Sequence, residues 1–115
     1  MNNKSRTKVI MLGTGTPNPT PERQGPSMAI VVEDRSYLIE AGTGIVRQAS
    51  KAVQMGIEAL NMTKLTHCFL THLHSDHTIG LPDLITTPWI LERTEPLNIF
   101  GPTGTAKMVD HLMAA

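Results

Sequence analysis

Between His72 and His77 the sequence reads HLHSDH, which places three imidazoles and one carboxylate within six residues. Neutral imidazole is a good ligand for zinc and similar borderline metals, and carboxylate oxygens complete many such sites. The four candidate ligands, His72, His74, Asp76 and His77, are too crowded to converge easily on one tetrahedral ion. Two adjacent metal ions fit the spacing better. Paired metal ions generate hydroxide from water and hold the oxygens of the reacting group, so the segment predicts metal-dependent hydrolysis.

The elements around this segment favour that interpretation over surface histidines. His72 and His74 follow an expected strand at a spacing of two, so their rings can point to the same side. Asp76 and His77 come next, on a tight loop that would face the second ion. Asp76 has two open roles, as a pure ligand or as a ligand that also deprotonates the attacking water. Thr71, just before the first ligand, is expected to support it through a hydrogen bond.

The periodicity of apolar residues predicts strands alternating with helices. Expected strands are Val9–Leu12, Met28–Glu33, Ser36–Glu40, Leu65–Thr71 and Leu97–Phe100, and expected helices are Ile45–Met55, Leu81–Glu92 and Thr105–Ala115. The second and third strands should form an antiparallel hairpin that turns at Asp34-Arg35. Thr43 is expected to cap the first helix, with Gly56 as its stop signal. Pro88 is expected to kink or divide the second helix. This order predicts an α/β layer with a sheet covered by helices on at least one face.

The segment Gly13–Pro21 is expected to be a structured loop, because its three prolines prevent helix formation. Gly13 and Gly15 therefore do not form a dinucleotide fingerprint, which needs a helix directly after it. The length of the loop suggests that it borders a site. Arg23, in the loop from Thr14 to Ser27, is expected to be exposed rather than bound to substrate.

Composition excludes several classes of function. Ten basic and ten acidic residues cancel, so no global field attracts nucleic acid or an anionic membrane. Cys68 is the single cysteine, which excludes an internal disulfide and fits a reducing cytosol. It is expected to be buried and inert. No apolar stretch approaches the ~20 residues that span a bilayer. The sequence thus predicts a soluble cytoplasmic protein with no membrane partner. His67 and His111 lack ligand spacing and are expected to be structural.

At the HLHSDH segment the chain resembles the metallo-β-lactamase superfamily, whose signature is His-x-His-x-Asp-His after a strand. Further similar segments are Val9–Gly15, Tyr37–Gly42 and Gly80–Leu84, which look most like the branch that holds ribonuclease Z and the arylsulfatase-like hydrolases. The resemblance implies an αββα sandwich with two zinc ions, or other divalent metals, at the edge between two sheets. It assigns the first metal to His72 and His74 and the second to Asp76 and His77. It also makes Asp76 a candidate for proton transfer.

Three features depart from the family pattern. Glu40 stands where the family usually has aspartate, and the turn Glu40–Val46 differs from the Asp-Cys-Gly-Glu-Gly-Thr-Gln turn of ribonuclease Z. The family also completes its site with a later histidine, a bridging aspartate and a final histidine, and the context of His111, Asp83 and Asp110 matches none of these. Residues 1–115 are therefore expected to form one partial domain, the N-terminal half of the sandwich, with the remaining ligands beyond Ala115.

Three functions follow as alternatives. The leading one is a dinuclear zinc hydrolase of a small-molecule or phosphodiester substrate, a sulfate ester or a related ester. The second is tRNA 3′ processing of the ribonuclease Z type, which needs a basic RNA-docking extension. The third is a catalytically incomplete fragment that only self-associates, because half a sandwich exposes an apolar sheet face. The chain is accordingly expected to be a homo-oligomer, dimeric or larger.

Overall fold

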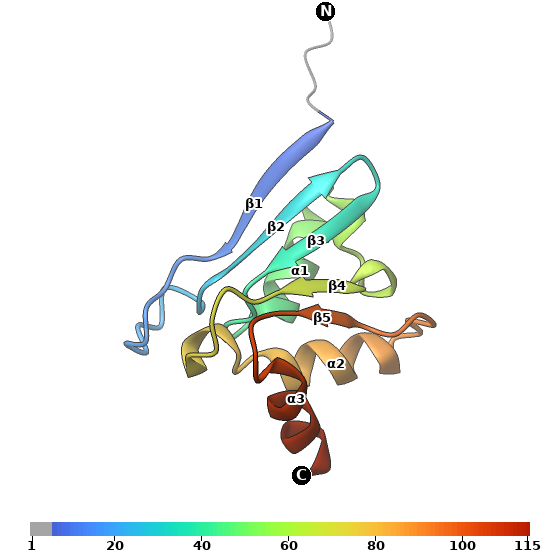
Figure 1. Cartoon of the computed structure of the whole chain (residues 1–115). Coiled ribbons are helices and arrows are strands. Elements are labelled where there is room, and N and C mark those ends of the chain that lie inside the picture. The colour runs from blue at the N-terminus through green and yellow to red at the C-terminus, as the bar shows by residue number, and fades with distance from the viewer. Residues whose placement is uncertain (1–5) are drawn as a thin grey trace, which may run out of the picture.

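The computed structural model describes residues 6–115, and its strands form one five-stranded sheet in the order β1-β2-β3-β4-β5 (Figure 1). The strands are β1 Thr7–Gly13, β2 Ser27–Val32, β3 Arg35–Ile39, β4 His67–Phe69 and β5 Asn98–Phe100. β2 is antiparallel to both of its neighbours, β1 and β3, whereas β3, β4 and β5 run parallel. The predicted α/β layer is thus confirmed as a mixed sheet with helices.

Helices pack against one face of this sheet. They are α1 Ile45–Gln54, α2 Leu81–Ile90 and α3 Thr105–Ala114, with short 3-10 turns at η1 Glu58–Leu60, η2 Met62–Lys64 and η3 Ser75–His77. Leu38 of β3 and Cys68 of β4 are fully buried, as are Ile45 of α1 and Leu84 of α2. The core therefore lies between the sheet and the first two helices. None of the helices in the described range is long and apolar enough to cross a membrane.

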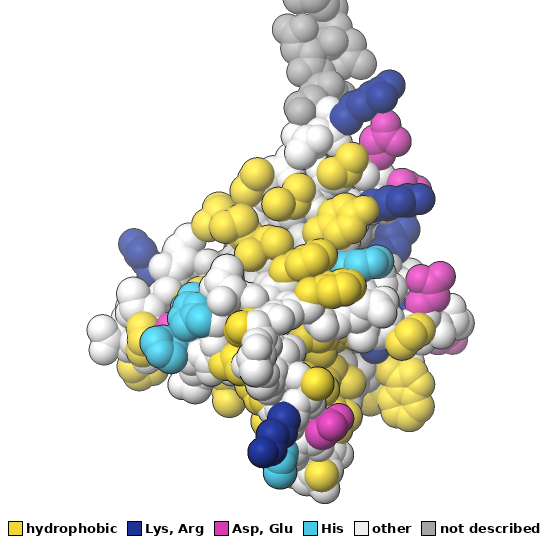
Figure 2. Space-filling view, in the orientation of Figure 1, with side chains coloured by type: hydrophobic (Ala, Val, Ile, Leu, Met, Phe, Trp, Pro, Cys, Tyr) yellow, Lys and Arg dark blue, Asp and Glu magenta, His cyan; other side chains and the backbone are white. Residues whose placement is uncertain are grey.

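The opposite face of the sheet is apolar and open to solvent. Side chains alternate across a strand, so those that do not enter the core gather on this second face. Figure 2 shows them as a continuous hydrophobic area over the strands. Val9, Met11 and Phe100 are 61%, 57% and 48% exposed. We call this area the open sheet face; its apolar residues are Val9, Met11, Met28, Ile30, Tyr37, Ile39, Phe69 and Phe100.

The strand boundaries differ from the prediction by one or more residues, and two of the differences have a visible cause. The hairpin turns at Glu33-Asp34 rather than Asp34-Arg35, because Arg35 pairs with Val32 across the ladder. Glu33 adopts a left-handed φ of 56° to make that tight turn. The predicted strand Leu65–Thr71 shortens to His67–Phe69. At its far end, the backbone N–H of Thr71 leaves the sheet to donate to a carboxylate, as described below.

The predicted cap of α1 is wrong, and so is the predicted division of α2. Thr43 does not cap α1: Gly44, with a φ of 84°, occupies the N-cap position and no side chain bonds there. Pro88 does not divide α2, which is one helix, although it ends at Ile90 rather than Glu92. Proline has no N–H, so Pro88 leaves the carbonyl of Leu84 without its helical donor. The guanidinium of Arg93 replaces that donor, at 3.0 Å from the Leu84 oxygen.

Replacing Arg93 by methionine is expected to lower the free energy of unfolding by about 2–4 kcal/mol. Arg93 is 6% exposed and donates to the carbonyls of Leu65, Leu84 and Ile85 at 3.2, 3.0 and 2.9 Å. Methionine fills similar space but leaves these carbonyls unpaired. Urea denaturation measures the change, and Arg47→Met, on the exposed side of α1, is the matched control. Equal stability of the two variants would contradict this role.

Candidate metal centre

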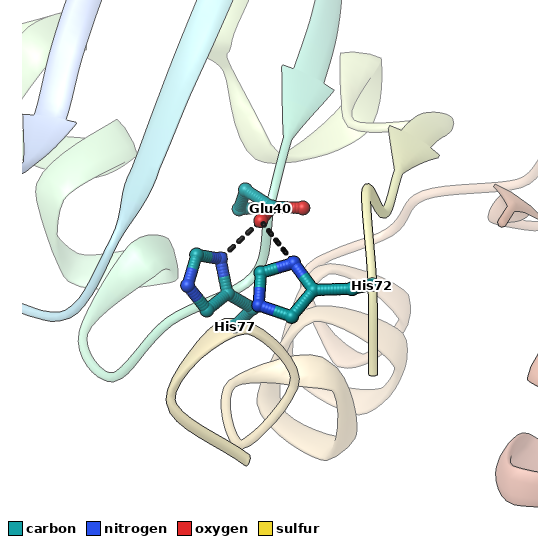
Figure 3. Close-up of side chains that lie close together, drawn as sticks. All are labelled: Glu40, His72 and His77. Carbon is teal, nitrogen blue, oxygen red and sulfur yellow. Dashed lines mark hydrogen bonds and ion pairs between the residues drawn. The ribbon is translucent and has the colours of Figure 1, made fainter. Parts of the chain in front are cut away.

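The candidate ligands lie where two parallel strands end at the same edge of the sheet. Glu40 follows β3, and the segment His72–His77 follows β4 and includes the 3-10 turn η3. The backbone N–H of Glu40 donates to the carbonyl of Phe69, so pairing continues to this edge. Figure 3 shows the side chains of Glu40, His72 and His77 pointing toward one another.

The Glu40 carboxylate accepts the hydrogen bonds that hold this arrangement together. It is 8% exposed and accepts hydrogen bonds from the backbone N–H and the hydroxyl of Thr71, at 2.7 and 2.8 Å. The oxygen Oε2 that accepts the hydroxyl also accepts from Nδ1 of His77. Carboxylates buried in this way are stabilised by such donors. Glu40 therefore fixes the loop that carries the first ligand and the ring of the last one.

These hydrogen bonds determine which nitrogen of each ring carries the proton. The Thr71 hydroxyl has one hydrogen and donates it to Glu40, so it accepts from Nδ1–H of His72 at 2.9 Å. His77 likewise donates its Nδ1–H to the carboxylate. In a neutral imidazole the other nitrogen is then an acceptor. In this neutral form both rings present an unprotonated Nε2, the form in which histidine binds a metal.

The two remaining predicted ligands lie beside these rings. The ring centroids of His72 and His74 are 4.6 Å apart, and those of His72 and His77 are 4.2 Å apart. Oδ2 of Asp76 lies 3.5 Å from Nε2 of His77. His74 and Asp76 thus each lie beside one of these rings, but among the described residues the ligand atoms that converge within 4.8 Å belong to Glu40, His72 and His77 and do not include theirs.

Two backbone hydrogen bonds hold the segment that follows β3 against the segment that follows β4. The N–H of Ala41 donates to the carbonyl of His77, and the N–H of Gly80 donates to the carbonyl of Ala41, both at 2.8 Å. A Cβ on Gly80 would lie 2.3 Å from the carbonyl oxygen of Gly42. The backbone at position 80 can therefore approach the Ala41-Gly42 segment this closely only if the residue is glycine. Glu40 itself has a φ of 66°, which is unusual for a side chain other than glycine. Strain of this kind is commonly retained at functional sites.

The chemistry of these donors fits a metal ion. One ligand atom each from Glu40, His72 and His77 lies within 4.8 Å of the others. Two imidazoles and a carboxylate suit zinc and its neighbours. Because Glu40 already accepts three hydrogen bonds, its geometry favours orienting the ligands over binding the ion.

The other histidines lie elsewhere. His67 belongs to β4 and lies between Tyr37 and Phe100, with ring-centroid distances of 5.5 and 6.3 Å. His111 lies on α3 and joins no group of metal-ligating side chains within the described range.

The loop after β1 borders the site, as its length indicates. A cavity of about 420 Å³ is lined by this loop together with Thr43, Ser75 and Asp76. Arg23 lines this cavity and is exposed. The backbone holds the loop in place, since the N–H of Gly25 donates to the carbonyl of Thr43.

Cys68 is expected to resist alkylation in the folded protein. Burial, with a smaller contribution from the Glu40 charge, raises the pKa of its thiol to about 12. The reactive thiolate is therefore scarce at pH 8, and the side chain is inaccessible. Labelling with iodoacetamide should be negligible in buffer and complete in urea. Rapid labelling in buffer would contradict the burial of the Cys68 side chain.

The fold and the site define a known class of protein. Residues 20–112 match the family described as the metallo-beta-lactamase superfamily, and the chain belongs to that superfamily. Among curated proteins, the ribonuclease Z of Pyrococcus abyssi is 43% identical over 106 residues, covering 92% of this chain and 33% of that protein. The ribonuclease Z of Mycobacterium marinum is 37% identical over 111 residues, covering 94% and 38%. The chain thus spans little more than a third of the length of these relatives.

Comparison with solved structures supports the same fold. The short form of human tRNase Z superimposes with a TM-score of 0.78 and 32% identity, covering 92% of this chain and 38% of that one. The metallo-beta-lactamase fold protein YhfI from Bacillus subtilis gives a TM-score of 0.73 at 21% identity, covering 92% and 40%, which supports the fold alone. The sheet and helices therefore correspond to the N-terminal part of this fold, as the sequence predicted.

Proposed function

We propose that the chain contributes the principal metal-binding segment of a dinuclear zinc hydrolase. His72 and His74 would hold one ion, and Asp76 and His77 the other. The observation that carries this proposal is the hydrogen-bond network around Glu40, which favours Nδ1–H on both His72 and His77 and leaves Nε2 as the nitrogen of each ring that could bind a metal.

When bound, such ions supply hydroxide at neutral pH and neutralise charge on the oxygens of the reacting group. The residues of this chain have separate tasks around them. Glu40 and Thr71 hold the two rings in one tautomer and orientation. Asp76, which is only 17% exposed at its side chain, lies between His77 and the loop cavity. Its Oδ2 is the atom best placed to accept a proton from the attacking water.

The substrate class follows from the relatives and from the loop cavity. The relatives named ribonuclease Z favour a phosphodiester, with a sulfate ester or related ester as alternatives of similar charge and shape. Cleavage of tRNA 3′ ends is the second candidate, and the identity of 43% to such a relative supports it. The net charge of the chain is zero, so RNA docking would rely on a basic extension outside it.

We also propose that residues 1–115 form the N-terminal part of one larger domain whose second sheet covers the open sheet face. The remaining metal ligands would come from that part. A chain without it would self-associate instead, because an exposed apolar face of this extent drives association. The unpaired thiol of Cys68 suits the reducing cytoplasm that we expect as its location.

Metal content and hydrolysis, measured together, test this proposal. The complete protein, which includes the part that supplies the remaining ligands, should contain zinc and cleave an aryl phosphodiester, and His72→Ala should lose both. His111→Ala, which changes the same side chain on α3, should lose neither. Parallel assays with an aryl sulfate and a precursor tRNA identify the substrate class. Unchanged metal content and activity in His72→Ala would exclude the proposed site.

A further inference from the structure

The cavity next to the candidate metal centre is formed by two segments that are far apart in the sequence. Its lining combines the loop after β1 with Ser75, Asp76 and Ile79, which belong to the turn η3 and the residues that follow it. Its volume of about 420 Å³ lies at the small end of the range for sites that bind organic molecules. The cavity therefore suits a small ring system.

Backbone hydrogen bonds hold both segments in place. The N–H of Gly25 donates to the carbonyl of Thr43, and the N–H of Gly42 donates to the carbonyl of Pro26, both at 3.0 Å. A Cβ on Gly42 would lie 2.4 Å from the carbonyl carbon of Gly25, so the loop after β1 packs directly on the turn after β3. Through Ala41, the same turn is bonded to the metal-binding segment. The cavity is thus formed before any ligand binds, which lowers the entropic cost of binding.

Apolar surface is concentrated at this cavity. The side chain of Ile79 lines it and is 59% exposed. One exposed isoleucine is ordinary on a protein surface, but three proline rings line the same cavity, those of Pro17, Pro19 and Pro21. Apolar lining of this kind favours an uncharged ring over a strongly hydrated group.

The charges at the cavity are too few for a nucleic-acid strand. Among the described residues that line it, Arg23 is the one cation, and the one carboxylate, Asp76, would repel phosphates. Proteins that hold single strands line the path of the backbone with several cations. A nucleotide chain therefore fits this cavity less well than a small uncharged group.

The position of Asp76 indicates which part of a diester reaches the cavity. In an in-line displacement, water attacks on the side opposite the leaving group. The proposed function places the Asp76 carboxylate beside that water, and the same residue lines the cavity. The cavity therefore lies on the side of the attacking water, where it receives the group that stays bonded to phosphorus.

We propose that this cavity binds a small aryl group that the phosphodiester substrate retains after cleavage. Ile79 is the residue that determines specificity for that group, and the proline rings complete the apolar surface around it. The inference rests on the proposed hydrolase function, and it narrows the substrate to a diester whose retained group is an aryl ring.

Three diesters with the same 4-nitrophenol leaving group test the proposal on the complete protein. Their retained groups are phenyl, methyl and 5′-thymidyl. After each kcat/KM is divided by the rate constant of the same diester in alkali, the phenyl diester should exceed the methyl diester by at least about tenfold. It should also exceed the thymidyl diester. A phenyl diester that is cleaved no better than the methyl diester would overturn the proposal, and so would a preference for the thymidyl diester.

Substitution of Ile79 assigns the preference to the cavity. Ile79→Asn should bring the ratio of phenyl to methyl diester to within about threefold of one, because the apolar surface is replaced by an amide. Ile90→Asn changes an isoleucine that is 69% exposed on α2 and outside the cavity lining, and it should keep the original ratio. Zinc content checks that the metal-binding segment of Ile79→Asn is intact. An unchanged ratio in Ile79→Asn would overturn the proposal.

Binding of phenol separates failure of this inference from failure of the proposed function. A complete protein that holds no zinc and cleaves none of the diesters would exclude the hydrolase function. The cavity is tested without catalysis by ¹H–¹⁵N NMR in the presence of EDTA. Phenol should shift the amide resonances of Gly25, Thr43 and Ile79 with a dissociation constant of about 1–10 mM. Ile79→Asn should weaken this binding several-fold, and Ile90→Asn should not. Absence of these shifts would show that the cavity does not bind an aryl ring.

Discussion

Replacing Glu40 by glutamine is expected to weaken zinc binding by about ten- to a hundred-fold. An amide oxygen can still accept from the backbone N–H of Thr71, but the amide nitrogen then faces two donors, the Thr71 hydroxyl and Nδ1–H of His77. The rings would have to change tautomer to avoid that conflict, which places the proton on Nε2. A competition titration against a chromophoric zinc chelator measures the loss.

Two matched variants separate this effect from a general change of charge. Glu40→Asp keeps a carboxylate on a shorter side chain and should retain affinity within a few-fold of the original. Glu58→Gln removes an exposed carboxylate on the turn η1 and should have no effect. Equal zinc affinity in Glu40→Gln and the unmodified protein would show that Glu40 does not orient the ligands.

The second prediction with a large expected effect is self-association of the chain through the open sheet face. The 115-residue chain is expected to be dimeric or larger at micromolar concentration, because burying exposed apolar side chains of this size contributes about 1.5–3 kcal/mol each. Met11→Lys/Phe100→Lys places two charges on the face and should weaken association at least about a hundred-fold. Sedimentation velocity over a range of concentrations measures the dissociation constant.

Met55→Lys is the control for that pair. Met55 is 75% exposed, more than either residue of the open sheet face, but it lies at the end of α1 on the other side of the sheet. It should leave association unchanged. A compact monomer of the unmodified chain at micromolar concentration would contradict the prediction, and so would an equal loss in Met55→Lys.

Local patterns predicted most of the elements because each depends on a short stretch of sequence. Short apolar runs beside a turn predicted β2 and β3, and helical spacing predicted α1 with its buried residues Ile45, Ala49 and Ala52. The errors arise where a distant residue decides the outcome. Pro88 predicts an interruption in α2, but Arg93, five residues later, supplies the missing donor. No periodicity identifies such a replacement in advance.

The candidate site likewise has a part that the local sequence predicts and a part that depends on the fold. The spacing of His72, His74, Asp76 and His77 is a local signal, and the sequence alone marked it. The role of Glu40 as the shared acceptor depends on two parallel strands ending side by side, which is a property of the sheet. Thr71 was expected to support His72, and the structure adds that the same hydroxyl connects this ring to Glu40.

Long-range ¹H–¹⁵N NMR of the histidine rings tests most directly whether this chain binds metal through histidines oriented by Glu40 and Thr71. The chemical shifts distinguish a protonated nitrogen, an unprotonated one and one that binds a metal. His72 and His77 should both carry the proton on Nδ1 before zinc is added, and zinc should then shift their Nε2 resonances but leave His111 unchanged. Rings protonated on Nε2, or Nε2 resonances that zinc does not move, would contradict the proposed site.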